Sequence, residues 1–350
     1  MTSILIFIAG AALLVYSAEK LIVYLVGAAS GLHVSVFLLA IVFTGNEFDD
    51  VALGVALNLG DLGGVALGTV FGTAISMTGV VLALTAIITP TRVNIPRSYV
   101  LLFAAAPLVM VPFILTAPLT AVHGAVLLLL FVLFIAYVAA KELRTSTPVF
   151  RNAEILERIE VGGDSGGLHE GSDRPADRPP FLVTVPFSKD RKLPGWAGLG
   201  LAVVALVGVI AGATATSFGT EGIISDFAIE GTLFGATIAT LVLTIEDIVL
   251  SVEPTRKGAP EIGVGNVIGS VVFGVTAKLG IIVLAGGSIV VDDDVLDWHL
   301  PVLVVMTALS AFFINTGRLR RWHGFVLLAL YVAYWVVSFT AFGGAPIEAD

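Results

Sequence analysis

Apolar segments of about 20 residues recur along the whole chain, each bounded by glycine, proline or charged residues. An α-helix of that length crosses a hydrocarbon core of about 30 Å. The pattern predicts ten such helices, at residues 4–27, 34–58, 63–88, 98–115, 120–140, 196–217, 232–252, 262–287, 300–314 and 325–341. We therefore expect an all-α integral membrane protein of about ten transmembrane helices, arranged as two groups of five.

A polar stretch at residues 141–195 separates the two groups. It is rich in glycine, proline and charge, a composition that buries too little apolar surface to fold by itself. We expect a disordered loop there. The predicted organisation is a first five-helix repeat at 1–140, the loop at 141–195, a second five-helix repeat at 196–342 and a tail at 343–350.

The amino-acid composition limits the class of protein, the ligand atoms of any metal site and the possible partners. The chain is 57% hydrophobic and 13% charged, with a mean hydropathy of +1.00, which is too apolar for a soluble domain. It has no cysteine, so any metal site must use oxygen or nitrogen ligands, and oxygen ligands favour hard cations. A net charge of −9 argues against nucleic acid as a partner. The expected partners are the lipid bilayer and inorganic cations; we expect no cofactor and no obligatory protein partner.

Lysine and arginine fall on one side of the predicted membrane. The basic residues of the predicted loops lie after the third, fifth, seventh and ninth helices, whereas the opposite side has no lysine or arginine and carries acids such as Asp61, Asp292 and Asp350. Because cytoplasmic loops retain basic residues, we expect a multi-pass protein of the cell membrane with both termini outside and the long loop in the cytoplasm.

A constant offset of 197 residues aligns the two halves. An odd number of helices per half inserts the second half upside down relative to the first, which is the inverted-repeat arrangement of many transporters. The offset superposes five chemically similar pairs: Asp49 on Glu246, Asp50 on Asp247, Gly68 on Gly265, Gly72 on Gly269 and Thr73 on Ser270.

Carboxylates gather at matching places in the two halves. The second predicted helix contains Glu47, Asp49 and Asp50 near its middle, and the seventh contains Glu246 and Asp247. Acidic side chains inside a membrane are costly and usually mark ion pathways. We expect Asp50 and Asp247 to hold ions, with the other three tuning charge or carrying protons.

Further oxygen ligands lie close to these acids along the chain. Calcium takes six to eight oxygens from carboxylates, carbonyls and hydroxyls, and sodium uses the same atoms. The candidate ligands besides the five acids are Asn46, Thr69, Thr73, Thr244, Asn266 and Ser270.

Each of these candidate ligands could have a structural role instead of binding an ion. The hydroxyls could bond helix backbone instead of ions. Asp49 and Glu246 could form ion pairs with Lys20 or Lys278, the basic residues inside the predicted spans. We interpret the four glycines of the aligned pairs as small-residue positions that let helices approach closely.

The segment from Gly265 to Ser270, which begins 18 residues after Asp247, resembles the second α-repeat of the calcium:cation antiporter superfamily, the sodium/calcium exchanger fold. Residues 45–50 and 68–73 resemble the corresponding motifs of the first repeat. The resemblance covers both halves and leaves out only the loop. It implies alternating access, with Asp50 and Asp247 in place of the two ion-binding glutamates of the family.

The chain departs from that family in several ways. Aspartate replaces glutamate in both repeats, and Asp49 and Glu246 stand where the family has proline. A polar residue that the family often carries 27 positions after each key acid is here Met77 or Gly274. The set of ion ligands therefore differs from that of the family, which leaves the coupling ion and the stoichiometry open.

These observations favour a secondary antiporter that exchanges calcium for sodium or protons. A proton-coupled exchanger of divalent cations is one alternative, because crowded carboxylates bind protons when cations leave. Magnesium or manganese could be the divalent ion. A passive channel and a non-transporting sensor or scaffold are further alternatives. Nothing in the motifs predicts an enzyme.

Overall fold

A computed structural model describes residues 2–30, 47–142, 195–256, 258 and 260–342. The predicted loop, apart from its ends, and the C-terminal tail lie outside the described residues. So do the first part of the second predicted helix and the candidate ligand Asn46.

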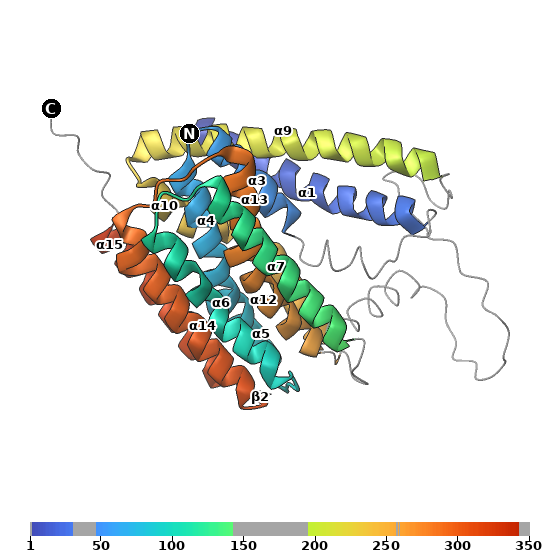
Figure 1. The fold of residues 1–350 in the computed structure, drawn as a ribbon, viewed down its shortest axis with the longest axis vertical. Helices are drawn as coiled ribbons and strands as arrows, with labels where there is room; N and C mark the ends of the chain where they lie inside the picture. The colour runs from blue at the N-terminus through green and yellow to red at the C-terminus, as the bar shows by residue number, and fades with distance from the viewer. Residues whose placement is uncertain (1, 31–46, 143–194, 257, 259, 343–350) are drawn as a thin grey trace.

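The described part of the chain is almost entirely helical (Figure 1). In the first half the elements are α1 (Thr2–Ser30), α3 (Phe48–Leu59), α4 (Gly63–Ser76), the π-helix η1 (Met77–Val81), α5 (Leu82–Ile88), β1 (Thr91–Arg92), α6 (Arg97–Leu115) and α7 (Ala121–Glu142).

In the second half the elements are α9 (Gly195–Phe227), α10 (Gly231–Phe234), η2 (Gly235–Ala239), α11 (Thr240–Arg256), α12 (Pro260–Phe273), η3 (Gly274–Lys278), α13 (Leu279–Gly286), η4 (Val295–His299), α14 (Leu300–Asn315), β2 (Arg318–Leu319) and α15 (Arg321–Ala341). Within the described residues, nine helical segments are long and apolar enough to cross a membrane. These nine correspond to nine of the ten predicted spans.

The helix boundaries repeat at the predicted offset. Helix α4 starts at residue 63 and α12 at residue 260, and they end at 76 and 273, so both boundaries differ by 197. The π-helices that follow, η1 at 77–81 and η3 at 274–278, differ by the same number. Equivalent residues in the two halves therefore adopt the same local conformation, down to the π-helical turn inside the third and eighth spans.

Contacts between loops agree with an inverted arrangement. The loop after α5 pairs with the loop after α14, through antiparallel Thr91 with Leu319 and Arg92 with Arg318. A separate bridge joins Leu119, after α6, to Ile289, after α13. The third span of one half and the fourth span of the other thus end on the same side, as an odd number of helices per half requires.

Two long helices lie apart from the main bundle. Helices α1 and α9 run side by side and cross the other helices at a steep angle (Figure 1). Their backbones approach closely, since a Cβ added at Gly212 would lie 2.5 Å from the amide nitrogen of Leu14. Helix α9 continues ten residues beyond the predicted end at Ser217. The reason is that this last part still packs on α1, with Gly219 against Phe7.

The third and eighth spans form the centre of the bundle. Of the residues in their apolar windows, 83% and 78% are buried, a larger share than in the other described spans. The candidate ion ligands among the described residues lie on these two spans, on α11 and at the start of α3, and α3 and α11 pack against the two spans.

Candidate ion-binding site

Three buried carboxylates lie at the start of α3. Glu47 directly precedes the helix, and Asp49 and Asp50 lie in its first turn, all of them at most 5% exposed. The sequence predicted a helix through residues 34–58 with these acids near its middle. That prediction is corrected, because α3 begins at Phe48. The free N–H groups and positive dipole end of a helix stabilise negative charge in its first turn.

The second half contributes Glu246 and Asp247 from α11. Asp247 is 8% exposed, and Glu246 is half-buried. The Asp247 carboxylate interacts electrostatically with Glu47, Asp49, Asp50 and Glu246. The structure therefore brings together, within electrostatic range, the five acids that the sequence singled out from two distant segments.

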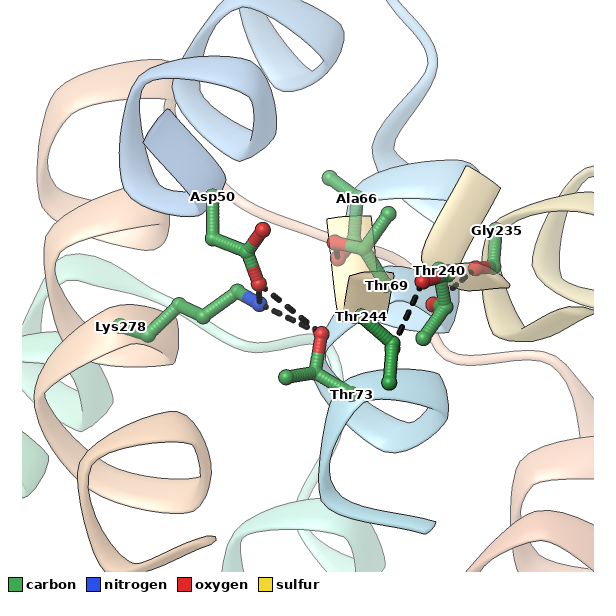
Figure 2. A network of polar contacts seen from close by, with 8 residues as sticks. All are labelled: Asp50, Ala66, Thr69, Thr73, Gly235, Thr240, Thr244 and Lys278. Carbon is green, nitrogen blue, oxygen red and sulfur yellow. Dashed lines mark hydrogen bonds and ion pairs between the residues drawn. The ribbon is translucent and has the colours of Figure 1, made fainter. Parts of the chain in front are cut away.

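A lysine lies among these acids. Lys278, the last residue of η3, is completely buried, and its ammonium group donates a hydrogen bond to Asp50 Oδ2. The same ammonium lies 3.0 Å from Thr73 Oγ1, which itself donates to Asp50 Oδ2 at 2.9 Å (Figure 2). Asp50, Thr73 and Lys278 thus form a closed triangle that joins α3, α4 and η3.

The two lysines named in the ion-pair alternative have partners of their own in the structure. Lys278 pairs with Asp50, and Lys20 pairs with its neighbour Glu19 at 2.9 Å. The sequence offered Lys278 as a possible partner of Asp49 or Glu246 but did not predict its ion pair with Asp50. The available signal was an isolated basic residue inside an apolar span, because such residues are rare in a membrane and pair with acids there.

Several buried oxygens in the site have no hydrogen-bond partner among the described residues. They are both carboxylate oxygens of Glu47, Oδ1 of Asp49 and Oγ of Ser270, and the side chains of Glu47 and Ser270 lie near each other. Buried polar atoms are normally paired, so each of these atoms needs a physical explanation. Unpaired carboxylate and hydroxyl oxygens are the atoms that a hard cation binds.

The other predicted ligands make contacts of their own. Thr69 and Thr244 donate hydrogen bonds from their hydroxyls to the carbonyls of Ala66 and Thr240, both at 2.8 Å (Figure 2). These are bonds to the helix backbone, which was the structural alternative for the hydroxyls. Such hydroxyls keep lone pairs for a cation. Asn266 donates through Nδ2 to Ser251 Oγ at 3.2 Å, and its Oδ1 remains an acceptor.

The glycines of the aligned pairs divide into two kinds. A Cβ at Gly68 would lie 2.1 Å from the carbonyl oxygen of Thr232, and one at Gly72 would lie 2.3 Å from Thr240 Oγ1. These two glycines allow α4 to approach the α10–η2–α11 span. A Cβ at Gly269 would meet no described atom within 4 Å, so the packing interpretation does not hold for Gly269 among these residues.

Within the described ranges, no three carboxylate or histidine side chains converge closely enough to form a ready metal site. The acids instead interact over longer distances, with the Lys278 ammonium attracting both Asp50 and Glu47. The arrangement can bind a cation through carboxylate, hydroxyl and amide oxygens once side chains close around it.

Comparison with known proteins gives a consistent result. The model of the family described as sodium/calcium exchanger protein matches residues 2–140 and 197–340. The chain is 33% identical over 112 residues to the sodium/calcium exchanger MaX1 of Methanosarcina acetivorans, a match that covers 32% of each protein. It is 24% identical over 269 residues to an uncharacterized membrane protein of Methanocaldococcus jannaschii, covering 77% of this chain and 75% of that protein.

The fold also resembles a solved structure. The sodium-calcium exchanger NCX_Mj, soaked with sodium and without calcium, superposes with a TM-score of 0.55 at 21% identity. The match covers 97% of this chain and 98% of that one.

Proposed function

The chain belongs to the sodium/calcium exchanger protein family, and from that premise we propose that it exchanges calcium for sodium across the cell membrane. Members of this family are transporters of cations, and the chain has the many apolar spans of a multi-pass membrane protein. The choice of calcium and of sodium is the part that we propose.

The observation that carries the proposal is the meeting of carboxylates from two repeats around buried oxygens that have no hydrogen-bond partner among the described residues. Asp50 and Asp247 come from repeat-related positions, 197 residues apart, and interact electrostatically. Two acids on opposite halves can hold one divalent ion between them. Alternating access then needs one half to rock against the other.

We assign the roles as follows. Asp50 and Asp247 hold the ions, and Glu47, Asp49 and Glu246 adjust the charge of the site. Oxygens that complete the coordination are those of Asn46, Thr69, Thr73, Thr244, Asn266 and Ser270. Calcium and sodium are substrates, and the proposal includes no cofactor.

The proposed orientation puts both termini outside and the long loop in the cytoplasm. On that orientation, a cavity of about 280 Å³ opens on the outer side, between α3 and the segment after α13. Asp61 and Asp292 line it. Acidic walls raise the local concentration of cations, so this cavity suits an entrance to the site.

The test is uptake of radioactive calcium into proteoliposomes under separately imposed sodium and pH gradients. Wild type is compared with Asp50→Asn and Asp247→Asn. Asp226→Asn is the matched control, because Asp226 is exposed and its carboxylate accepts a hydrogen bond from Ser3 Oγ at 3.1 Å instead of facing the site acids. Uptake driven by sodium, lost in both site variants while they remain folded and kept in the control, supports the proposal.

The other outcomes decide between alternatives. Uptake driven by the pH gradient alone makes protons the counter-ion. If excess magnesium or manganese inhibits calcium uptake and is itself transported, that ion is the substrate instead of calcium. Absence of flux under either gradient, in protein that remains folded, overturns exchange and leaves a sensor or scaffold. Flux that does not depend on a counter-ion indicates a channel.

A further inference from the structure

Lys278 occupies the kind of position that a monovalent cation takes in an ion site. Its ammonium group contacts the carboxylate of Asp50 and the hydroxyl of Thr73, two of the proposed ligands, and attracts Glu47. An ammonium group carries one positive charge, and here it contacts one carboxylate oxygen and one hydroxyl oxygen, the kinds of atom that sodium also binds.

The lysine is held in place. It is the last residue of η3, which packs against α3, α4, α6 and α7, and the side chain is 0% exposed. An ammonium group removed from water is very costly unless it stays next to an opposite charge. Leaving Asp50 would therefore require a new partner inside the bundle.

The lysine also breaks the symmetry of the two repeats. The residue at the equivalent position of the first half, 197 residues earlier, is Val81, which is apolar and buried. One turn before Lys278, a Cβ at Gly274 would meet no described atom within 4 Å. The second half therefore has a glycine without a side chain at position 274 and a positively charged side chain one turn later, at position 278.

We propose that Lys278 is a tethered cation that is not transported and that takes the place of one sodium ion in the site. The inference rests on the proposed function and adds to it the number of sodium ions exchanged for each calcium ion. The ammonium offsets one negative charge of the site throughout the cycle while Asp50 keeps its other carboxylate oxygen for ions, so each calcium ion is exchanged for one sodium ion fewer than the same site would require without the lysine.

The first experiment measures this number directly. Proteoliposomes containing wild type or Lys278→Gln are given a fixed tenfold sodium gradient, with the membrane potential clamped at zero, and the calcium gradient at zero net flux is measured. Every sodium ion moved adds the same free energy, so one additional ion should make the sustained calcium gradient about tenfold larger in Lys278→Gln.

Two matched variants complete the set. Lys278→Arg keeps the positive charge and should sustain the wild-type gradient. Lys20→Gln removes a lysine from a span but outside the site, where its partner is Glu19, and should also leave the gradient unchanged. An unchanged gradient in an active Lys278→Gln protein would overturn the proposal. So would higher calcium affinity at unchanged stoichiometry, because that result makes Lys278 a competitor that calcium displaces.

A second measurement covers the case in which Lys278→Gln is too unstable to transport. Thermal unfolding of the purified protein in detergent is followed as sodium replaces choline in the buffer. If sodium can take the place of the ammonium, the variant should be unstable in choline and recover with sodium, with a larger sodium-dependent shift in Tm than wild type. Failure of sodium to stabilise the variant would show that Lys278 only anchors the fold, and would overturn the inference.

The two proposals fail in different ways. The sodium-dependent shift in Tm needs no calcium and no transport, so it tests the tethered cation by itself. Absence of gradient-driven calcium uptake in wild type would contradict the proposed function and leave this binding result in place.

Discussion

Lys278 and Asp50 form a fully buried ion pair between residues that are 228 positions apart in the chain. Asp50 lies in the first turn of α3 in the first repeat, and Lys278 ends η3 in the second. The pair therefore joins the two halves at the point where the proposed ions bind. Its strength affects both the stability of the bundle and the charge of the site.

Breaking this pair should be more costly than removing it. Asp50→Asn leaves a buried ammonium without its counter-charge, and Lys278→Met leaves a buried carboxylate, so each should destabilise the protein by about 3–5 kcal/mol in sodium-free buffer. The double variant Asp50→Asn/Lys278→Met should recover most of that loss. Thermal unfolding in detergent measures all three. A control is Glu19→Gln, which breaks a partly exposed pair and should cost less than about 1 kcal/mol. Additive losses in the double variant would show that the two groups do not interact energetically.

Glu47 should be needed for cation binding and not for the stability of the fold. Both of its carboxylate oxygens are buried and have no hydrogen-bond partner among the described residues. Glu47→Gln removes a buried charge while keeping the shape, so the protein without cations should be as stable as wild type or more stable. The rise in Tm on adding calcium should become smaller. A full calcium response in Glu47→Gln would remove this residue from the ligand set.

Close packing at Gly68 should not tolerate a methyl group. A Cβ there would lie 2.1 Å from the carbonyl oxygen of Thr232 and 2.9 Å from the amide nitrogen of Ala236, and these backbone atoms cannot rotate away. Gly68→Ala should destabilise the protein by about 1–3 kcal/mol or more and separate the third span from the seventh. In the control Gly200→Ala, the added Cβ meets no described atom within 4 Å. Alanine is the better helix former, so Tm should stay constant or rise there.

Glu230 should make stability depend on pH. It precedes α10, where its carboxylate accepts hydrogen bonds from the amide groups of Thr232 at 2.6 Å and Leu233 at 2.5 Å. Burial raises the pKa of Glu230 above its ordinary value of 4.5, so the folded protein holds this proton more tightly than the unfolded chain does. The contribution of the residue to stability is therefore fully present below pH 4.5 and falls as pH rises through the folded-state pKa.

Glu230→Gln isolates this effect, because glutamine is neutral at every pH and keeps an oxygen that can accept a backbone hydrogen bond. The Tm of wild type minus that of Glu230→Gln should fall as pH rises from about 4.5 towards neutral. Glu230→Ala removes the cap as well and should cost about 1 kcal/mol. A difference in Tm that rises with pH would contradict the assigned direction of the pKa shift.

The linear pattern of hydropathy was enough to locate the spans. The predicted third helix at 63–88 coincides with α4, η1 and α5, and the predicted offset of 197 reappears in the boundaries of α4 and α12. Such features depend on the transfer free energy of each residue, which is a local property and can be read along the chain.

Pairing across the bundle was not predictable in the same way. The sequence contained Lys278 and five acids, and a partner for the lysine could be any of them, because the choice depends on how each helix is rotated about its axis. Packing of η3 against α3 and α4 decided that the partner is Asp50. The tertiary structure also decided that α9 continues to Phe227, since the contact of Gly219 with Phe7 on α1 stabilises residues whose own polarity predicted a loop.

The sequence by itself determined the membrane class, the two repeats and the acids available to a site. The tertiary structure decided which oxygens lack a hydrogen-bond partner within the described ranges, as in Asp49, and which are already bonded, as in Thr69 and Thr244. The physical reason is that hydrophobicity sums along a chain, whereas hydrogen bonds and ion pairs form between specific atoms that only the packing of helices brings within reach.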